Sequence, residues 1–341
     1  MLKPEAKAVV SRYWGPVLDQ APNSFLSTTS ASFAGILTLP KLASMARLPT
    51  DSLGDMEREL SALSITNKDK ITRCARYDTD PPAFNMPEGS PRILLFEKMT
   101  GFRDEPSVTA STHLFETLAE TNGWALVITE NGAAITPGIL QQFDAVIWNN
   151  NSGDVLTLNQ REAFKDYINN GGGYLGIHGA GGDYNYHWDW YPDVLIGARF
   201  IGHPKDPQFN TTAVQMEANT TGIGTGVAPS WDLNEEWYSF GTNPREKGLS
   251  IIATVDESRY SAQGHGGQDL RMGDHPVVWA HCVGNGRAFY SAIGHRPEVY
   301  AASEYIAVLQ QAVKWVAGKG ESVCRNDRQV TKKSIKSDIK L

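Results

Sequence analysis

A histidine at the tip of a glycine-rich turn is the feature of this sequence that most directly indicates chemistry. The segment Gly171–Gly182 runs from an apolar stretch into small residues, with His178 at the turn. Gly176 and Gly179 flank it as in a nucleophile elbow, where neighbouring chain comes too close for a Cβ. Imidazole carries protons or binds metals, so the turn predicts acid–base or metal chemistry rather than an acyl-enzyme. Alternatively, Gly171–Gly173 end a helix and His178 is a hydrogen-bonded strand-end residue.

Three further histidines adjoin glycine or proline at predicted strand ends or loops: His203, His275 and His295. Together with His178 they indicate a divalent-metal site or an acid–base cluster. No His-x-x-x-His or His-x-His spacing occurs, so such a site would be assembled from distant segments. For His203 and His275, a rigid His-Pro turn is a nearly equal alternative. Among the other histidines, His113 and His281 are interpreted as structural residues, and no feature of the sequence indicates a role for His187 or His265.

Aromatic side chains are dense between Tyr184 and Tyr191, and flat rings suit the C–H faces of sugars. Trp190 and Tyr191 cannot share one face, so part of this group would pack inward. Arg103 either clamps a substrate oxygen or forms a surface ion pair with Asp104 or Glu105. The substrate-binding candidates are Arg103, Asn149, Tyr184, Trp190, Tyr191 and Tyr238.

Apolar strands alternate with helical spacing through the middle of the chain. The predicted strands are Arg92–Glu97, Trp124–Thr129, Ala145–Trp148, Tyr174–His178, Leu249–Val255, Pro276–Val283 and Arg287–Ile293. The predicted helices are Val108–Thr121, Thr136–Gln142, Thr157–Asn169 and Ser303–Ala317. This alternation predicts an α/β protein with a doubly wound, mainly parallel sheet flanked by helices. Ligands of such sheets bind outside the carboxyl ends of the strands, so the polar loops after three strands should converge on one rim.

The predicted domain covers residues 91–320, between two segments of different character. Residues 1–90 show no sustained period and predict a partly irregular extension, with short helices near Lys3–Tyr13 and Ser52–Leu63. Residues 321–341 are polar and rich in lysine, which predicts a mobile tail.

Composition excludes several classes of partner. The 341 residues are 41% hydrophobic and carry a net charge of −7, without the basic surface that nucleic-acid binding needs.

The three cysteines, Cys74, Cys282 and Cys324, are widely spaced and odd in number, which predicts reduced thiols, with Cys282 in the core. No apolar run is long enough to span a membrane and no export signal is present, which predicts a cytoplasmic protein unless an export segment precedes this sequence. Oligomeric state is not indicated.

The domain resembles the trehalose-utilisation (ThuA-like) family, within the class I glutamine amidotransferase-like superfamily. The likeness runs from about Arg92 to Gly318. It rests on the series Gly101-Phe-Arg103, Gly171 to Ala180, Trp190-Tyr191, Gly197 to Phe200, His203-Pro204, Glu236 to Phe240, His275 to Trp279, Gly286 to Tyr290 and Gly294-His295. Two positions depart from the family pattern: Asp104 stands where histidine is usual, and Glu235 where aspartate is frequent.

The resemblance implies a flavodoxin-like core and a role in carbohydrate breakdown, on keto-disaccharides or keto-glycosides. It implies no glutaminase activity, because His178 replaces the elbow cysteine. It also selects His295 and Glu236, the latter as general base or metal ligand, with Glu235 a solvated neighbour. Strand alternation allows only one of these two glutamates to enter a cleft.

The leading hypothesis is an enzyme that moves a proton next to a keto-sugar carbonyl, giving isomerisation or elimination, with His178, Glu236 and His295 as catalytic residues. A divalent metal held by these residues with His203 and His275 is the cofactor to consider, and no nucleotide cofactor is expected. The alternatives are a metal-dependent glycoside or ester hydrolase, or a non-catalytic carbohydrate-binding or regulatory protein. The expected partner is a small carbohydrate.

Overall fold

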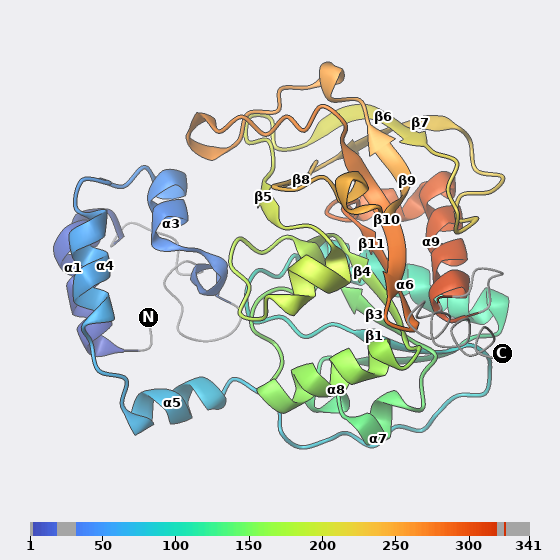
Figure 1. Ribbon diagram of the computed structural model, residues 1–341, viewed down its shortest axis with the longest axis horizontal. Coiled ribbons are helices and arrows are strands. Elements are labelled where there is room, and N and C mark those ends of the chain that lie inside the picture. The colour runs from blue at the N-terminus through green and yellow to red at the C-terminus, as the bar shows by residue number, and fades with distance from the viewer. Residues whose placement is uncertain (1–2, 19–31, 319–323, 325–341) are drawn as a thin grey trace, which may run out of the picture.

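Five parallel strands form the centre of the protein, in the order β2–β1–β3–β4–β11 (Figure 1). The computed structural model describes residues 3–18, 32–318 and 324. The strands are β2 (Ala125–Thr129), β1 (Arg92–Phe96), β3 (Ala145–Asn149), β4 (Gly173–Ile177) and β11 (Gly286–Ser291). Helices cover both faces of this half of the sheet, which explains why the inner strands are continuous apolar runs. The predicted α/β fold, with parallel central strands flanked by helices, is confirmed.

The same sheet continues through four antiparallel strands. They are β10 (Pro276–Val283), β9 (Ser250–Val255), β6 (Asn210–Met216) and β7 (Ser230–Glu235), in that order outward from β11. A separate pair joins β5 (Phe200–Gly202) to β8 (Ser239–Phe240). The sheet is therefore more mixed than predicted. A two-residue turn at Gly284 and Asn285 connects β10 to β11, and so short a connection allows only antiparallel pairing.

The helices of the domain lie close to their predicted positions. They are α6 (Glu105–Asn122), α7 (Pro137–Leu140), α8 (Leu158–Asn169) and α9 (Ser303–Val316). Figure 1 shows α7 and α8 on one side of the sheet, with α6 and α9 on the other. Thr157 caps α8 through the backbone N–H of Gln160, whose side chain bonds back to the Thr157 backbone, a capping box that fixes where the helix starts.

Helices also form before the domain. They are α1 (Pro4–Leu18), the 3₁₀ turn η1 (Phe33–Ile36), α3 (Leu39–Ala46), α4 (Leu53–Ser61) and α5 (Asn67–Cys74). A small hydrophobic cluster of their own buries Val9, Val10, Trp14, Ala43, Leu48 and Met56. The sequence predicted α1 and α4 but not α3 or α5, each of which has only eight residues, too few to establish a helical period. In the described part of the chain, no helix combines the length and apolarity needed to cross a bilayer.

The cysteine prediction is wrong for two of the three residues. Cys282 and Cys324 form a disulfide with their Cα atoms 5.5 Å apart, and Cys282 lies on the exposed side of β10 rather than in the core. Cys74 is free and exposed. The two cysteines are 42 residues apart in sequence, so their spacing gave no indication that they pair. Apart from Cys324, the predicted C-terminal tail lies outside the described residues.

We expect Cys282→Ser to lower the free energy of unfolding by up to about 4 kcal/mol, because the disulfide closes a long loop in the unfolded chain. Urea unfolding measures this, with the exposed Cys74→Ser as control. Thiol titration of the denatured, unreduced protein should find a single free thiol. Three thiols would contradict the pairing.

Candidate functional site

A cavity of about 210 Å³ opens at the carboxyl ends of β1, β3 and β4. The loops that follow these strands all reach it, as the sequence predicted, and the antiparallel half of the protein supplies the opposite wall. Its polar lining residues are Asp104, Ser107, Asn150, Ser152, His178, Asp183, Tyr184, His203, Gln208, Glu236, Tyr238, His265 and His295. Six sequence-predicted site residues are thereby brought together: His178, Tyr184, His203, Glu236, Tyr238 and His295.

The turn after β4 holds His178 in a left-handed backbone conformation, with φ +38°. Such a conformation is uncommon outside glycine and is found where the surrounding structure enforces it. A Cβ on Gly179 would lie 2.9 Å from the Asn150 carbonyl oxygen, which explains the glycine next to the histidine. The imidazole stacks on Tyr238 with ring centroids 4.0 Å apart, and only 3% of the residue is exposed.

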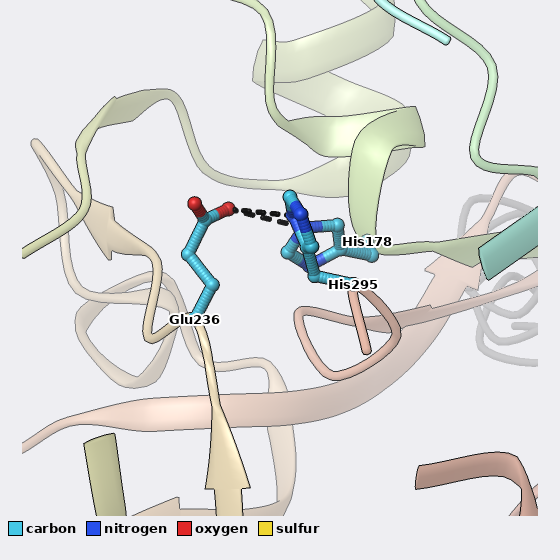
Figure 2. Close-up of side chains that lie close together, drawn as sticks. All are labelled: His178, Glu236 and His295. Atoms are coloured by element: carbon cyan, nitrogen blue, oxygen red, sulfur yellow. Dashed lines mark hydrogen bonds and ion pairs between the residues drawn. The ribbon is translucent and has the colours of Figure 1, made fainter. Parts of the chain in front are cut away.

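Three donor atoms from distant segments meet in this cavity (Figure 2). Nε2 of His178 lies 3.3 Å from Oε2 of Glu236 and 3.2 Å from Nδ1 of His295. The same Nδ1 lies 3.1 Å from Oε2 of Glu236. Ligand atoms of a tetrahedral site with metal bonds of about 2.0–2.1 Å stand about 3.3 Å apart. The three side chains therefore have the spacing of the ligands of a first-row divalent cation.

The hydrogen bonds of His178 are compatible with such a cation. Its Nδ1 is 2.7 Å from the carbonyl oxygen of Ala292 and so carries the proton, which leaves a lone pair on Nε2 of the neutral ring. That lone pair faces a carboxylate oxygen of Glu236, and two acceptors need a proton or a cation between them. Burial lowers the pKa of His178, which disfavours the proton. A cation bound by the three side chains, or a proton on Nδ1 of His295, which lies 3.2 Å from Nε2 of His178 and 3.1 Å from Oε2 of Glu236, satisfies this arrangement.

Glu236 is ionised although only 2% of it is exposed. Burial alone raises the pKa of this carboxyl, but the imidazoles of His203, His178 and His295 outweigh burial and hold the pKa well below its usual range. For His295, burial lowers the pKa, and the carboxylates of Glu236, Glu235 and Asp104 outweigh it, so that the pKa is raised. The cavity floor thus contains a negative charge stabilised by imidazoles.

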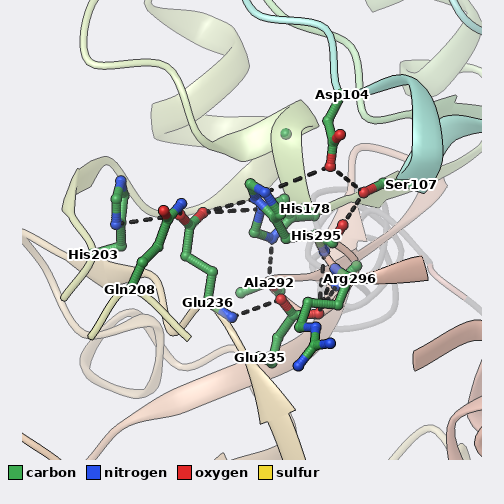
Figure 3. Close-up of polar contacts among 12 residues, drawn as sticks. Asp104, Ser107, His178, His203, Gln208, Glu235, Glu236, Ala292, His295 and Arg296 are labelled. Carbon is green, nitrogen blue, oxygen red and sulfur yellow. Dashed lines mark hydrogen bonds and ion pairs between the residues drawn. The ribbon is translucent and has the colours of Figure 1, made fainter. Parts of the chain in front are cut away.

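A second layer of polar contacts holds the three ligands in place (Figure 3). Oε1 of Glu236 accepts a hydrogen bond from Gln208 and lies 3.2 Å from Nδ1 of His203. On the other side, Oδ2 of Asp104 lies 3.5 Å from Nε2 of His295. Carboxylates that contact the far nitrogen of a ligating histidine are typical of metal sites. Asp104, which departs from the family pattern, therefore faces the site.

Glu235 is not the solvated neighbour that the sequence suggested. It is fully buried, and its carboxylate accepts hydrogen bonds from the backbone N–H groups of Glu236, Gly294, His295 and Arg296. The last three of these donors belong to the loop after β11, and the buried carboxylate satisfies them. Glu235 thereby fixes the loop that carries His295.

Five predicted site residues lie outside the cavity lining. Arg103 pairs with Glu105 and Glu130, which was the surface alternative. Asn149 donates to Glu97, and its neighbour Asn150 lines the cavity instead. Consecutive side chains along a strand point to opposite faces of the sheet, so a difference of one position decides which asparagine side chain enters the cavity.

His275, Trp190 and Tyr191 complete this set. Both ring nitrogens of His275 contact oxygens, Glu257 Oε1 at 2.7 Å and the Tyr238 carbonyl at 2.8 Å, so it is not available as a ligand. Trp190 stacks on Trp188, and the hydroxyl of Tyr191 donates to the Ala180 carbonyl. Of the aromatic stretch from Tyr184 to Tyr191, Tyr184 alone lines the cavity; its neighbours pack against the domain.

Sequence reasoning missed other lining residues, among them His265, Gln208 and Asp183. No feature of the sequence indicated a role for His265, yet it lies beside His203 with ring centroids 5.7 Å apart. These residues lie in irregular segments, where no periodicity shows the direction of a side chain.

Comparison with known proteins identifies the family of this chain. Residues 92–316 match the family described as ThuA, trehalose utilisation. The chain belongs to the ThuA family. A ThuA-like protein from Bacteroides uniformis has a similar structure, with 25% identity, a TM-score of 0.58 and coverage of 71% of this chain and 97% of that chain. A ThuA-like protein from Parabacteroides merdae is 16% identical, with a TM-score of 0.48 and coverage of 69% and 93%. No curated protein matches the chain.

The buried carboxyl of Asp183 predicts a pH-dependent stability. Burial raises its pKa to about 7, while the unfolded chain releases this proton near pH 4. Between these values the folded state binds more protons, so stability falls as the pH rises. Asp183→Asn removes this fall in stability, because an amide does not titrate. The amide can still accept a hydrogen bond from the Gly153 N–H and can donate one to Ser152.

We expect Asp183→Asn to match the wild type near pH 4.5 and to exceed its free energy of unfolding at pH 8 by up to about 4 kcal/mol. Urea unfolding at both pH values measures the difference. The exposed Asp166→Asn on α8 serves as control. An Asp183→Asn variant with the same pH dependence as the wild type would contradict the argument.

Proposed function

We propose that this protein is an enzyme of carbohydrate utilisation that transfers a proton next to the carbonyl of a keto-disaccharide or keto-glycoside, with a divalent cation held by His178, Glu236 and His295. The observation that supports this most strongly is the meeting of Nε2 of His178, Oε2 of Glu236 and Nδ1 of His295 within 3.3 Å of one another. When bound, the cation supplies positive charge to polarise the substrate carbonyl.

The residues next to the three ligands would carry the proton. Asp104 lies beside His295, and His203 lies beside Glu236, so titratable groups flank the ligands on two sides. One of them accepts the proton from the carbon next to the carbonyl, while the electron pair of that C–H bond moves toward the carbonyl oxygen. Return of the proton to the former carbonyl carbon, with the proton of the neighbouring hydroxyl passing to the former carbonyl oxygen, gives isomerisation. Departure of a substituent from the next carbon with its bonding electron pair, as the carbonyl re-forms, gives elimination. In this proposal His178 acts as a ligand rather than as the base.

Tyr184 and Tyr238 suit a sugar in the same cavity. Both rings line it, and the buried hydroxyl of Tyr184 has no hydrogen-bond partner among the described residues. A buried hydroxyl without a partner is costly, and a sugar hydroxyl could supply the missing bond. This favours a carbohydrate ligand over an apolar one next to Tyr184.

The disulfide bears on where the enzyme works. Disulfides persist in oxidising compartments and are rare in the cytosol, so the Cys282–Cys324 pair supports an extracytoplasmic location over the cytoplasmic one that the sequence predicted.

The metal assignment predicts about one equivalent of zinc or manganese per chain after equilibration and desalting, by elemental analysis. His178→Ala and Glu236→Ala should each lower the bound metal at least tenfold, because each removes a ligand. His275→Ala tests a histidine whose nitrogens contact Glu257 and Tyr238, and it should retain the metal. Equal metal content in all variants would contradict the assignment.

The catalytic proposal predicts that the wild type converts 3-keto-trehalose or a 3-keto-glucoside, with product identified by NMR. Glu236→Ala should lower kcat/KM by at least 10²-fold, and chelation should have a similar effect that added cation reverses. Exposed Ile71→Ala provides the control. Full turnover by a folded Glu236→Ala variant would exclude the mechanism, and sugar binding without any product would indicate a non-catalytic binding protein. A hydrolysis product would indicate the glycosidase alternative.

A further inference from the structure

The cavity is completed by a part of the chain that lies outside the family domain. The family match begins at residue 92, yet Ile36 at the end of η1 and Met45 in α3 both line the cavity. Ile36 is 2% exposed, and a Cβ on Gly101 would lie 2.6 Å from its Cγ2. The glycine in the loop after β1 therefore leaves room for a side chain from the N-terminal extension.

Specific contacts hold this segment, residues 32–47, against the domain on two sides. The Ser32 N–H donates to the Thr100 carbonyl at 3.0 Å, next to the loop after β1. At its other end, α3 contacts the turn His265–Gly267. Between them, Nζ of Lys41 lies 4.0 Å from the ring centre of Tyr184, itself a cavity residue. The segment thus spans the cavity from the Thr100 loop to the His265 turn.

The side chains of Ile36 and Met45, which line the cavity, are apolar. Isoleucine has no hydrogen-bonding atom, and the methionine sulfur is only a weak acceptor. Phe102 and Phe200 are apolar lining residues from the domain, where Phe102 stacks on His295 and Phe200 on His203, with ring centroids 6.3 Å and 6.2 Å apart. A second sugar ring placed against these apolar side chains would lose hydrogen bonds to water without replacement, which is costly. A phenyl or alkyl group would gain from the same contact.

We infer that residues 32–47 form a substrate-binding wall, and that the substrate is a keto-glycoside with an apolar aglycone rather than a keto-disaccharide. This rests on the proposed function and narrows it. The inner part of the cavity takes the oxidised sugar, and Ile36 and Met45 contact the aglycone. A cavity of about 210 Å³ is also smaller than the roughly 300–1,000 Å³ of sites for larger ligands, which favours a compact substrate.

The test compares phenyl 3-keto-glucoside with 3-keto-trehalose in wild type, Ile36→Ala/Met45→Ala and Met45→Gln. We expect the wild type to prefer the phenyl compound at least tenfold in kcat/KM. The double variant should lose most of that preference through a higher KM for the phenyl compound, with kcat and metal content unchanged. Met45→Gln keeps the chain length, adds an amide, and should shift the preference toward the disaccharide. Ile71→Ala, on the exposed face of α5, is the matched control.

Calorimetric titration of the same two compounds separates this inference from the proposed function. If no protein turns over either compound, the proposed reaction is wrong, but tighter phenyl binding that depends on Ile36 and Met45 still supports the wall. A wild type that prefers the disaccharide, or a folded double variant that keeps the phenyl preference in both assays, would overturn the inference.

Discussion

The cavity depends on one electrostatic constraint: a buried carboxylate needs positive charge around it. Glu236 is almost fully removed from water, and the imidazoles of His178, His203 and His295 surround it. Without these imidazoles, or a cation bound between them, the buried carboxyl would be protonated, because the ionised form is costly to remove from water. The contacts around the site serve this constraint. Asp104 lies beside His295, Gln208 bonds to Glu236, and the Ala292 carbonyl sets the tautomer of His178.

The fold brings these groups together by joining two kinds of sheet. Parallel strands end at one edge, so the loops after β1, β3 and β4 meet there, and β11 leads to His295 at the same edge. Glu236 follows β7, at the far end of the antiparallel half, and its segment returns to the cavity. Glu235, next to it in sequence, bonds to the loop that carries His295. The two adjacent glutamates thus have different roles: Glu236 lies in the cluster with His178 and His295, and Glu235 holds the loop that carries His295.

Membership of the ThuA family gives the fold and a general connection with sugar utilisation, but not a reaction. Around His178, Glu236 and His295, Asp104 lies beside His295, and Ile36 and Met45 line the cavity. The reaction has to be established at these residues, since function resides in the site rather than in the fold.

The sequence by itself determined β1–β4, β9–β11, α6–α9 and the position of His178, because apolar periodicity and glycines with close neighbours are local properties, but it did not show the strands β5–β8. It also indicated Glu236 and His295, through the resemblance. Only the tertiary structure decided that His275 contacts Glu257 and Tyr238 instead of joining the cluster, that Asn150 rather than Asn149 lines the cavity, and that Cys282 pairs with Cys324. It also brought His265, Ile36 and Met45 to the site. These facts depend on contacts between residues far apart in sequence and on side-chain directions in irregular segments, and no local pattern in a single sequence encodes either.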